Sequence, residues 1–146
     1  EMNEENNENR LNNIDEENLE KLLASVGDLD VTFHRAIDET KNLIESAKLL
    51  TKYPQIKRIL TSGGKGGIMN NINVIREMVE VTQGTMKIMV GGGLTKEILK
   101  SVIEGTGTCE VHFGTAVRKN KSVNGDISEE KLVELVEEYR KVIQNK

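Results

Sequence analysis

Four short apolar segments recur along the chain at regular intervals, and each ends in a polar or glycine-rich tip. They are VTFHRAID at 31–38, RILTSGG at 58–64, KIMVGGG at 87–93 and CEVHFGT at 109–115. The interval from His34 to Ser62 is 28 residues, that from Ser62 to Val90 is again 28, and that from Val90 to Phe113 is 23. Each interval is the length of one strand and one helix, so the chain is predicted to be an α/β protein built on a parallel sheet.

The residues between the tips have helical periodicity and helix-end signals. Asp15 is an expected N-cap and Gly27 an expected stop for the first helix. Further helices are expected at 41–52, at 68–81, after Thr95 and at 128–143. Right-handed crossovers would bring all four strand ends to one edge, which is where α/β folds bind ligands. Periodicity alone leaves a doubly wound sheet and a barrel as alternatives.

The composition narrows the class of protein further. The chain has 146 residues, enough for one domain with a core, and a formal charge of −4. An acidic domain serves neither nucleic acid nor an anionic membrane surface, and no apolar run approaches the roughly 20 residues of a spanning helix. The single cysteine, Cys109, excludes an internal disulfide. We therefore expect a soluble, cytoplasmic protein.

The beginning of the chain differs from the rest. Residues 1–13, EMNEENNENRLNN, are rich in Asn and Glu and contain little to bury, which predicts a disordered loop. The opening Glu-Met pair is unusual for a translation product, so the chain is expected to be a fragment or a processed product.

Strand alternation predicts which side chains face the site. In 30–34, Val31 and Phe33 suit a face covered by helices, which leaves His34 on the other face. In 109–113, the same rule leaves Glu110 and His112 on that face, so both histidines are expected at equivalent depth. His34, Glu110 and His112 are therefore candidate catalytic residues for acid–base chemistry. The alternative is that Glu110 only pairs with an inward Arg58.

Charged and glycine-rich tips suggest an anion site. Arg35 offers a fork for a carboxylate or phosphate, whereas Asp38 and Arg35 could instead form a surface pair. Glycines between a strand and a helix let backbone amides approach an anion, although they also simply permit tight turns. The candidate anion-binding residues beside Arg35 are Ser62, Gly63, Gly64, Gly91, Gly92, Gly93, Gly114 and Thr115.

The tips also resemble those of the CutC family, the so-called copper homeostasis proteins. The resemblance is carried by VTFHRAID at 31–38, RILTSGG at 58–64, IMVGGG at 88–93 and EVHFGTA at 110–116. It implies that residues 14–146 form the C-terminal part of a TIM-type (β/α)₈ barrel, whose first four strands have no counterpart here. It also implies copper as a ligand; the family's cysteine ligands would lie in the absent half, and the metal ligands in this chain remain unknown.

Three functions remain open: the two given next, of which the residues favour the second chemically, and a catalytically inactive barrel retained as an interaction module. The first is a CutC-like copper homeostasis protein that binds a copper ion, as the resemblance implies. The second is a barrel enzyme acting on a small anionic or phosphorylated substrate, with His112 and Glu110 as the acid–base pair. A half barrel also leaves two sheet edges open, so either another half or a second copy in a homo-oligomer is expected to pair with them.

Overall fold

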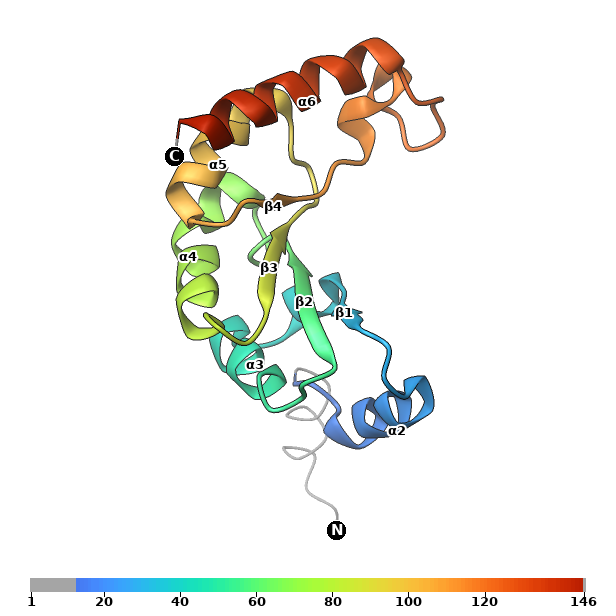
Figure 1. The fold of residues 1–146 in the computed structure, drawn as a ribbon, viewed down its shortest axis with the longest axis vertical. Helices are drawn as coiled ribbons and strands as arrows, with labels where there is room; N and C mark the ends of the chain where they lie inside the picture. Colours follow the sequence, from blue (N-terminus) through green and yellow to red (C-terminus); the bar gives the residue numbers. More distant parts are fainter. Residues whose placement is uncertain (1–12, 146) are drawn as a thin grey trace.

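A computed structural model of the protein describes residues 13–145. Within that range, four parallel strands form one sheet in the order β1-β2-β3-β4 (Figure 1). The strands are β1 Val31–Phe33, β2 Ile56–Thr61, β3 Lys87–Val90 and β4 Glu110–Val111. Because sequence neighbours are sheet neighbours and all run in one direction, the four tips lie along one edge, called the rim below. The predicted α/β class with parallel (β/α) units is confirmed.

Helices alternate with these strands and cover one face of the sheet. They are α2 Glu16–Val26, α3 Leu43–Leu50, α4 Ile72–Val81, α5 Lys96–Thr106 and α6 Glu129–Gln144. Helices α3, α4, α5 and α6 contact one another in turn, and α2 shares a cavity with α3. Figure 1 shows α2 at the β1 end of the sheet and α6 at the β4 end, while the opposite face of the sheet carries no described helix. No helix in residues 13–145 has the length and apolar character needed to cross a membrane.

Several predicted helix ends match the structure. The Asp15 side chain accepts a hydrogen bond from the Asn18 amide, and Gly27 is the C-cap of α2. The Ser128 side chain caps α6 through the Lys131 amide. Thr95 occupies the N-cap position of α5 but makes no capping hydrogen bond through its side chain.

Other boundaries differ from the prediction for physical reasons. Helix α3 begins after Asn42, whose side chain accepts hydrogen bonds from two first-turn amides, so the helix is shorter than 41–52. The strand expected at 109–113 contains only Glu110 and Val111. A 3-10 turn at Arg35–Glu39, η1, was not predicted and determines where Arg35 and Asp38 lie. The loop predicted for residues 1–13 falls, apart from Asn13, outside the described residues.

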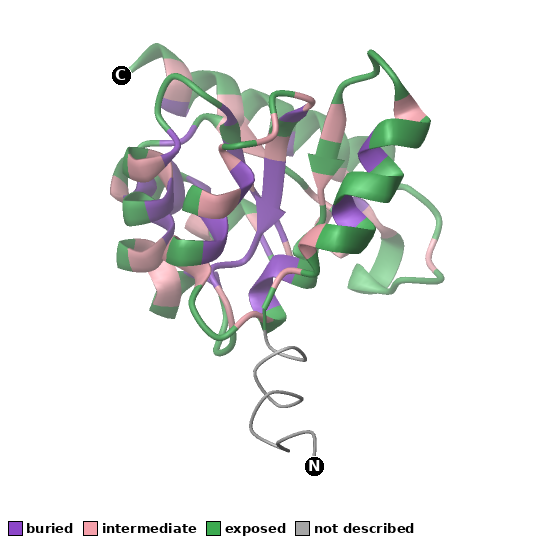
Figure 2. Cartoon of the chain, turned by 90° about the horizontal axis from the view of Figure 1, so that it is seen from below, coloured by how far each residue is buried: buried purple, intermediate pink, exposed green. Residues whose placement is uncertain are grey.

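The core lies between the sheet and its helices, where Figure 2 shows the buried residues gathered. Register aligns Phe33 with Ile59 and Ile59 with Ile88; the two isoleucines belong to this core, and Phe33 is partly buried against it. Val31 also packs against it, as alternation predicted. Each fully buried aliphatic side chain contributes roughly 1.5–3 kcal/mol relative to exposure. Apolar packing between the sheet and its helices therefore holds the strands in place, and the polar tips lie outside this core, at the rim.

Candidate functional site

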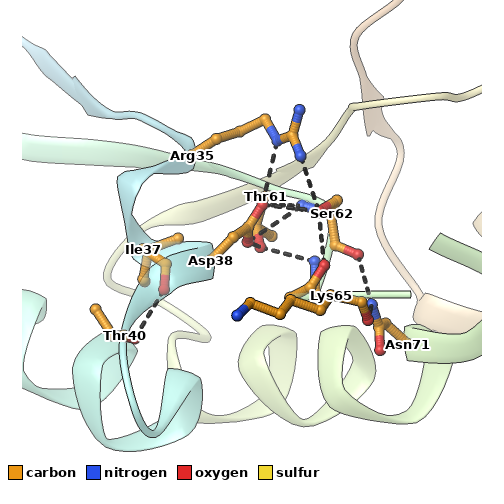
Figure 3. Close-up of polar contacts among 10 residues, drawn as sticks. Arg35, Ile37, Asp38, Thr40, Thr61, Ser62, Lys65 and Asn71 are labelled. Carbon is orange, nitrogen blue, oxygen red and sulfur yellow. Dashed lines mark hydrogen bonds and ion pairs between the residues drawn. The ribbon is translucent and has the colours of Figure 1, made fainter. Parts of the chain in front are cut away.

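Asp38 connects the first two tips of the rim (Figure 3). Its carboxylate accepts hydrogen bonds from the Thr61 hydroxyl, from the Ser62 amide at 3.0 Å and from the Ser62 hydroxyl at 2.7 Å. Only 7% of the residue is exposed. Burial alone would raise the pKa of Asp38, but the hydrogen bonds from Thr61, Ser62 and Arg35 outweigh it and hold the pKa below its ordinary value. Asp38 is thus a buried anionic anchor, and the pair that it forms with Arg35 is exposed only on the arginine side.

Arg35 is held by this anchor and still faces outward. Its Nε donates to Asp38 Oδ2 at 3.2 Å, and its Nη2 donates to Ser62 Oγ at 3.3 Å. The side chain is nevertheless 46% exposed. Within residues 13–145, Nη1 has no hydrogen-bonding partner, so one edge of the guanidinium is left for a ligand.

The third tip lies directly beneath that guanidinium. A Cβ atom built on Gly92 would come within 2.7 Å of Arg35 Cζ, so any other residue there would have to displace the guanidinium. The Gly91 amide donates to the Thr61 carbonyl at 3.0 Å, whereas the amides of Gly92 and Gly93 have no acceptor in the described part of the chain. On the other side, a Cβ on Gly91 would lie 3.0 Å from His112 Cβ. Arg35 and His112 therefore flank the Gly91–Gly92 turn.

The second tip is different, because its backbone groups already have partners. The Ser62 amide is bound by Asp38, and the Gly63 amide donates to Thr61 Oγ1 at 2.9 Å. A Cβ on Gly63 would come within 2.5 Å of Asn71 Cβ, and Asn71 Nδ2 donates to the Lys65 carbonyl at 3.0 Å. These contacts favour a packing role for Gly63. Its neighbour Gly64 is half-buried and accepts a hydrogen bond from Ser62 Oγ at 3.2 Å.

The fourth tip lies beyond β4. Gly114 is exposed, and Thr115 opens a short 3-10 turn at Thr115–Val117, η3. No hydrogen bond among the described residues joins either of them to Arg35 or to the Gly91–Gly93 turn. The structure therefore gathers Arg35 with the third tip and leaves Gly114 and Thr115 apart from that contact.

Glu110 is paired with Arg58 across the intervening strand. Arg58 donates through Nε to Glu110 Oε2 and through Nη2 to Oε1 at 3.2 Å, as the alternative interpretation of the sequence expected. The hydrogen bond to Glu110 raises the pKa of Arg58. The two side chains are 35% and 30% exposed, so the pair lies on the open face of the sheet, partly in contact with solvent.

The three candidate catalytic residues do not converge on one pocket. Glu110 lines a groove of about 420 Å³ that neither histidine lines. His34 and His112 are both exposed. The register aligns Phe33 with Ile59, Leu60 with Met89 and Met89 with Glu110. Continued by one residue, this register would put His34 level with Glu110, two residues before His112. The strand register therefore gives no support to the expected equal depth of the two histidines, which lie beyond the ends of β1 and β4.

The donor atoms present do not fit a copper site. Within residues 13–145, no group of three or more His, Cys, Asp or Glu side chains is arranged to hold a metal ion. Cu(I) prefers thiolate and thioether ligands, and the one cysteine, Cys109, is exposed.

Two polar residues at the site were not predicted from the sequence as site residues. Thr61 is fully buried on the helix-facing side of β2, level with Val90, and its hydroxyl binds Asp38. The sequence did contain a signal for Thr61, because strand alternation predicts an apolar core residue at that position and a threonine stands there instead. Asn71 closes the second tip from the start of α4, and no local pattern marked it.

Taken together, parallel (β/α) units in the order β1-β2-β3-β4, with helices on one face, have the arrangement found in part of a TIM-type barrel. A family model described as the CutC family matches residues 7–117, and the chain belongs to that family. A CutC family protein of Aliivibrio fischeri is 40% identical over 100 residues, which are 68% of this chain and 40% of that protein. The human copper homeostasis protein cutC homolog is 33% identical over 99 residues, 68% of this chain and 36% of that protein.

The likeness extends to three dimensions. The crystal structure of CutC from Streptococcus agalactiae superposes with a TM-score of 0.64 and 33% identity, over 69% of this chain and 50% of that one. The chain therefore spans half or less of the length of the relatives it matches. The fold class and the family are thus established for the part of the barrel that this chain contains.

Proposed function

We propose that this chain supplies the small-anion binding site of a CutC-family barrel protein. The ligand would bind to Arg35 Nη1 and to the amides of Gly92 and Gly93. The observation that carries the proposal is the position of the Arg35 guanidinium, which Asp38 and Ser62 hold over Gly92 with one edge exposed.

Physical chemistry favours an anion at this position. Charge-assisted hydrogen bonds from arginine are among the strongest that proteins make, and they are stronger still when the fork is already oriented. Backbone amides that precede a helix add partial positive charge, and the Gly91–Gly93 turn leads into the eleven-residue helix α5. Asp38 offsets part of the charge of Arg35, so we expect modest affinity and a preference for dianions.

His112 is the side chain best placed for proton transfer to or from such a ligand. Its Cβ would be 3.0 Å from a Cβ on Gly91, and its imidazole is exposed at the rim. Arg58 donates hydrogen bonds to Glu110, so in this proposal Glu110 balances the charge of Arg58 on the open face of the sheet. His112 would transfer a proton without help from Glu110. If the complete protein is an enzyme, its reaction would be general acid–base chemistry on an anionic substrate.

The test is a titration of the ¹⁵N-labelled chain with inorganic phosphate, followed by NMR. We expect phosphate to shift the amide signals of Gly92 and Gly93 and the Nε signal of Arg35. Arg35→Gln should abolish the shifts of the Gly92 and Gly93 amides, whereas Arg140→Gln, which removes the same charge from an exposed position on α6, should leave them unchanged. Equal responses in the two variants would mean that phosphate follows net charge alone.

Copper binding is the second candidate, and the names of the relatives favour it. The human and Dictyostelium discoideum relatives are called copper homeostasis protein cutC homologs. In this chain the soft or imidazole donors at the rim are His34, His112 and Met89, which form no closed set. A Cu(I) titration that stays stoichiometric in the wild type and fails in His34→Ala/His112→Ala would favour copper; weak binding in both would favour the anion.

A further inference from the structure

Beyond Gly63 the second tip continues as a glycine-rich loop, residues 64–67, called the Lys65 loop below. Its sequence is Gly-Lys-Gly-Gly, and all three glycines have positive φ values, from +84° to +108°. Side chains disfavour such conformations, so the glycines determine the path of the backbone. Gly64 is half-buried, and the other three residues are exposed. Lys65 thus carries the one side chain on a loop that is otherwise bare backbone.

The four carbonyl groups of this loop all accept hydrogen bonds from the protein. The donors are the Ser62 hydroxyl, the Asn71 side chain, and both the side chain and the amide of Asn70. The carbonyls and their distances to the donor atoms, in chain order, are Gly64 at 3.2 Å, Lys65 at 3.0 Å, Gly66 at 2.6 Å and Gly67 at 3.2 Å. Both asparagines belong to the 3-10 turn Ile68–Asn71, η2, which leads into α4. The loop is therefore held through its oxygen atoms.

The four amide groups of the same residues have no acceptor in the part of the chain that the structure describes. A folded backbone usually pairs its donors and its acceptors alike, so a loop that pairs every acceptor and no donor is unusual. An oxyanion only accepts hydrogen bonds, and a run of spare amides is therefore complementary to it. A cation, in contrast, would find no free carbonyl in this loop. The backbone itself thus favours an anionic ligand.

Lys65 adds a positive charge that no carboxylate of residues 13–145 balances. Its Nζ makes no ion pair or hydrogen bond within that range, whereas Arg35 and Arg58 are paired with Asp38 and Glu110. Figure 3 shows Lys65 and Arg35 on opposite sides of the contacts that Asp38 makes. Lys65 therefore keeps its charge for a ligand that does not contact Arg35.

We propose that the Lys65 loop is a second anion-binding site at the rim, which binds the phosphoryl group of a phosphorylated small molecule. The unpaired amides and the Lys65 ammonium would donate to the phosphoryl oxygens. A phosphoryl group offers three acceptor oxygens and up to two negative charges, so it satisfies more of these donors than a carboxylate does. Because residues 65–67 are exposed, the rest of the ligand has room outside the loop. The site shares no atom with the one formed by Arg35, Gly92 and Gly93 and does not depend on it.

The experiment is a titration of the ¹⁵N-labelled chain with methyl phosphate, a minimal phosphate monoester, and separately with acetate, followed by NMR. We expect methyl phosphate to shift the amide signals of residues 64–67 until they saturate, with an affinity at least about tenfold higher than that of acetate. Lys65→Gln should weaken this binding about tenfold, because it removes a charge-assisted hydrogen bond, and Lys65→Arg should retain most of it. Shifts that do not saturate, or equal affinities for methyl phosphate and acetate, would overturn the proposal.

The matched control for Lys65→Gln is Lys57→Gln. Lys57 is exposed near the other end of β2, so its substitution removes the same charge far from the loop and should change the affinity less than about twofold. Equal losses in the two variants would mean that methyl phosphate responds to net charge, and the loop would then not be its site.

Arg35→Gln separates this site from the one proposed above. The shifts of residues 64–67 should persist in that variant, while those of Gly92 and Gly93 disappear. If both sets of shifts disappear together, the Lys65 loop only reports binding at Arg35 through Ser62, and the second site does not exist. If residues 64–67 respond in the wild type and Gly92 and Gly93 do not, the Lys65 loop stands as a site and the Arg35 site fails.

Discussion

Arg35 covers Gly92 so closely that a Cβ atom on Gly92 would lie 2.7 Å from Arg35 Cζ and 2.8 Å from Nη1. Gly92 also has a φ of +95°, a conformation that side chains disfavour. Two separate causes therefore favour glycine at this position. The contact adds a structural reason for glycine at the third tip, since the residue makes room for the arginine.

Gly92→Ala should displace the Arg35 guanidinium and weaken phosphate binding about tenfold or more. The matched control is Gly93→Ala, which has a similar φ of +85° but meets nothing within 4 Å. Both variants carry the cost of the left-handed backbone, roughly 1–2 kcal/mol, in urea unfolding. Only Gly92→Ala should also shift the Arg35 Nε signal in NMR spectra; identical spectra for the two variants would show that Arg35 does not rest on Gly92.

Asp38→Asn should destabilise the protein by roughly 1–3 kcal/mol at neutral pH, because it removes a buried charge that accepts hydrogen bonds from Thr61, Ser62 and Arg35. The pKa of Asp38 is lowered on folding. Its stabilising contribution is therefore present above the ordinary value of 3.8 and disappears as the pH falls through the lowered folded value.

The measurement for Asp38 is urea unfolding of the wild type and Asp38→Asn from neutral to acidic pH. The difference in free energy of unfolding should shrink steadily below about pH 4. Asp38→Ala, which removes the acceptor altogether, should cost at least as much at neutral pH. A difference that does not change with pH would mean that the carboxylate is not charged in the folded state.

The sequence predicted the fold well because its strands and helices are determined locally. Leu19 and Leu23 lie at helical spacing between Asp15 and Gly27, and α2 begins and ends where those caps indicate. In the same way, a β-branched or aliphatic run before each tip was sufficient to locate the strands. The predicted helix boundaries were wrong where a capping side chain sets the first residue of the helix, as Asn42 does for α3.

The site was harder to predict because its contacts join residues far apart in the chain. Asp38 meets Thr61 and Ser62 only because β1 and β2 pair in parallel, and Arg35 reaches Gly92 across β2. Alternation correctly placed Glu110 on the open face, but it could not tell an acid–base residue from one half of an ion pair. The distance between side chains at a rim depends on strand register and on turns such as η1, which local patterns do not specify.

The Arg58–Glu110 pair should contribute little to the stability of this chain alone. Both side chains are about one-third exposed, so solvent screens their attraction. A double-mutant cycle with Arg58→Met and Glu110→Gln, measured by urea unfolding, should give a coupling energy below about 1 kcal/mol. A coupling above about 2 kcal/mol in the isolated chain would mean that the pair is already shielded from water.

Tyr53 attaches α2 to the rest of the molecule, and its ionisation should loosen that helix. Its hydroxyl donates to Glu16 Oε2 at 2.8 Å and to Glu20 Oε1 at 3.2 Å. The hydrogen bond to Glu16, followed by burial and the nearby charges, raises the pKa of Tyr53 from 10.0 to about 12. A raised folded pKa means that this stabilisation is fully present below pH 10.0 and is lost as the pH rises towards 12.

The chain has two tyrosines, so Tyr139→Phe leaves Tyr53 as the only phenol to titrate. In that background, ultraviolet absorbance should show phenolate forming with a midpoint near 12, provided that circular dichroism still reports folded protein. Adding Glu16→Gln and Glu20→Gln should return the midpoint towards 10.0, because neutral amides no longer oppose the phenolate charge. If both proteins titrate near 10.0, the hydroxyl does not donate to these carboxylates, and α2 must be held at the β1 edge by its packing and by the Gln55 side chain, which donates to the Leu23 carbonyl at 3.0 Å.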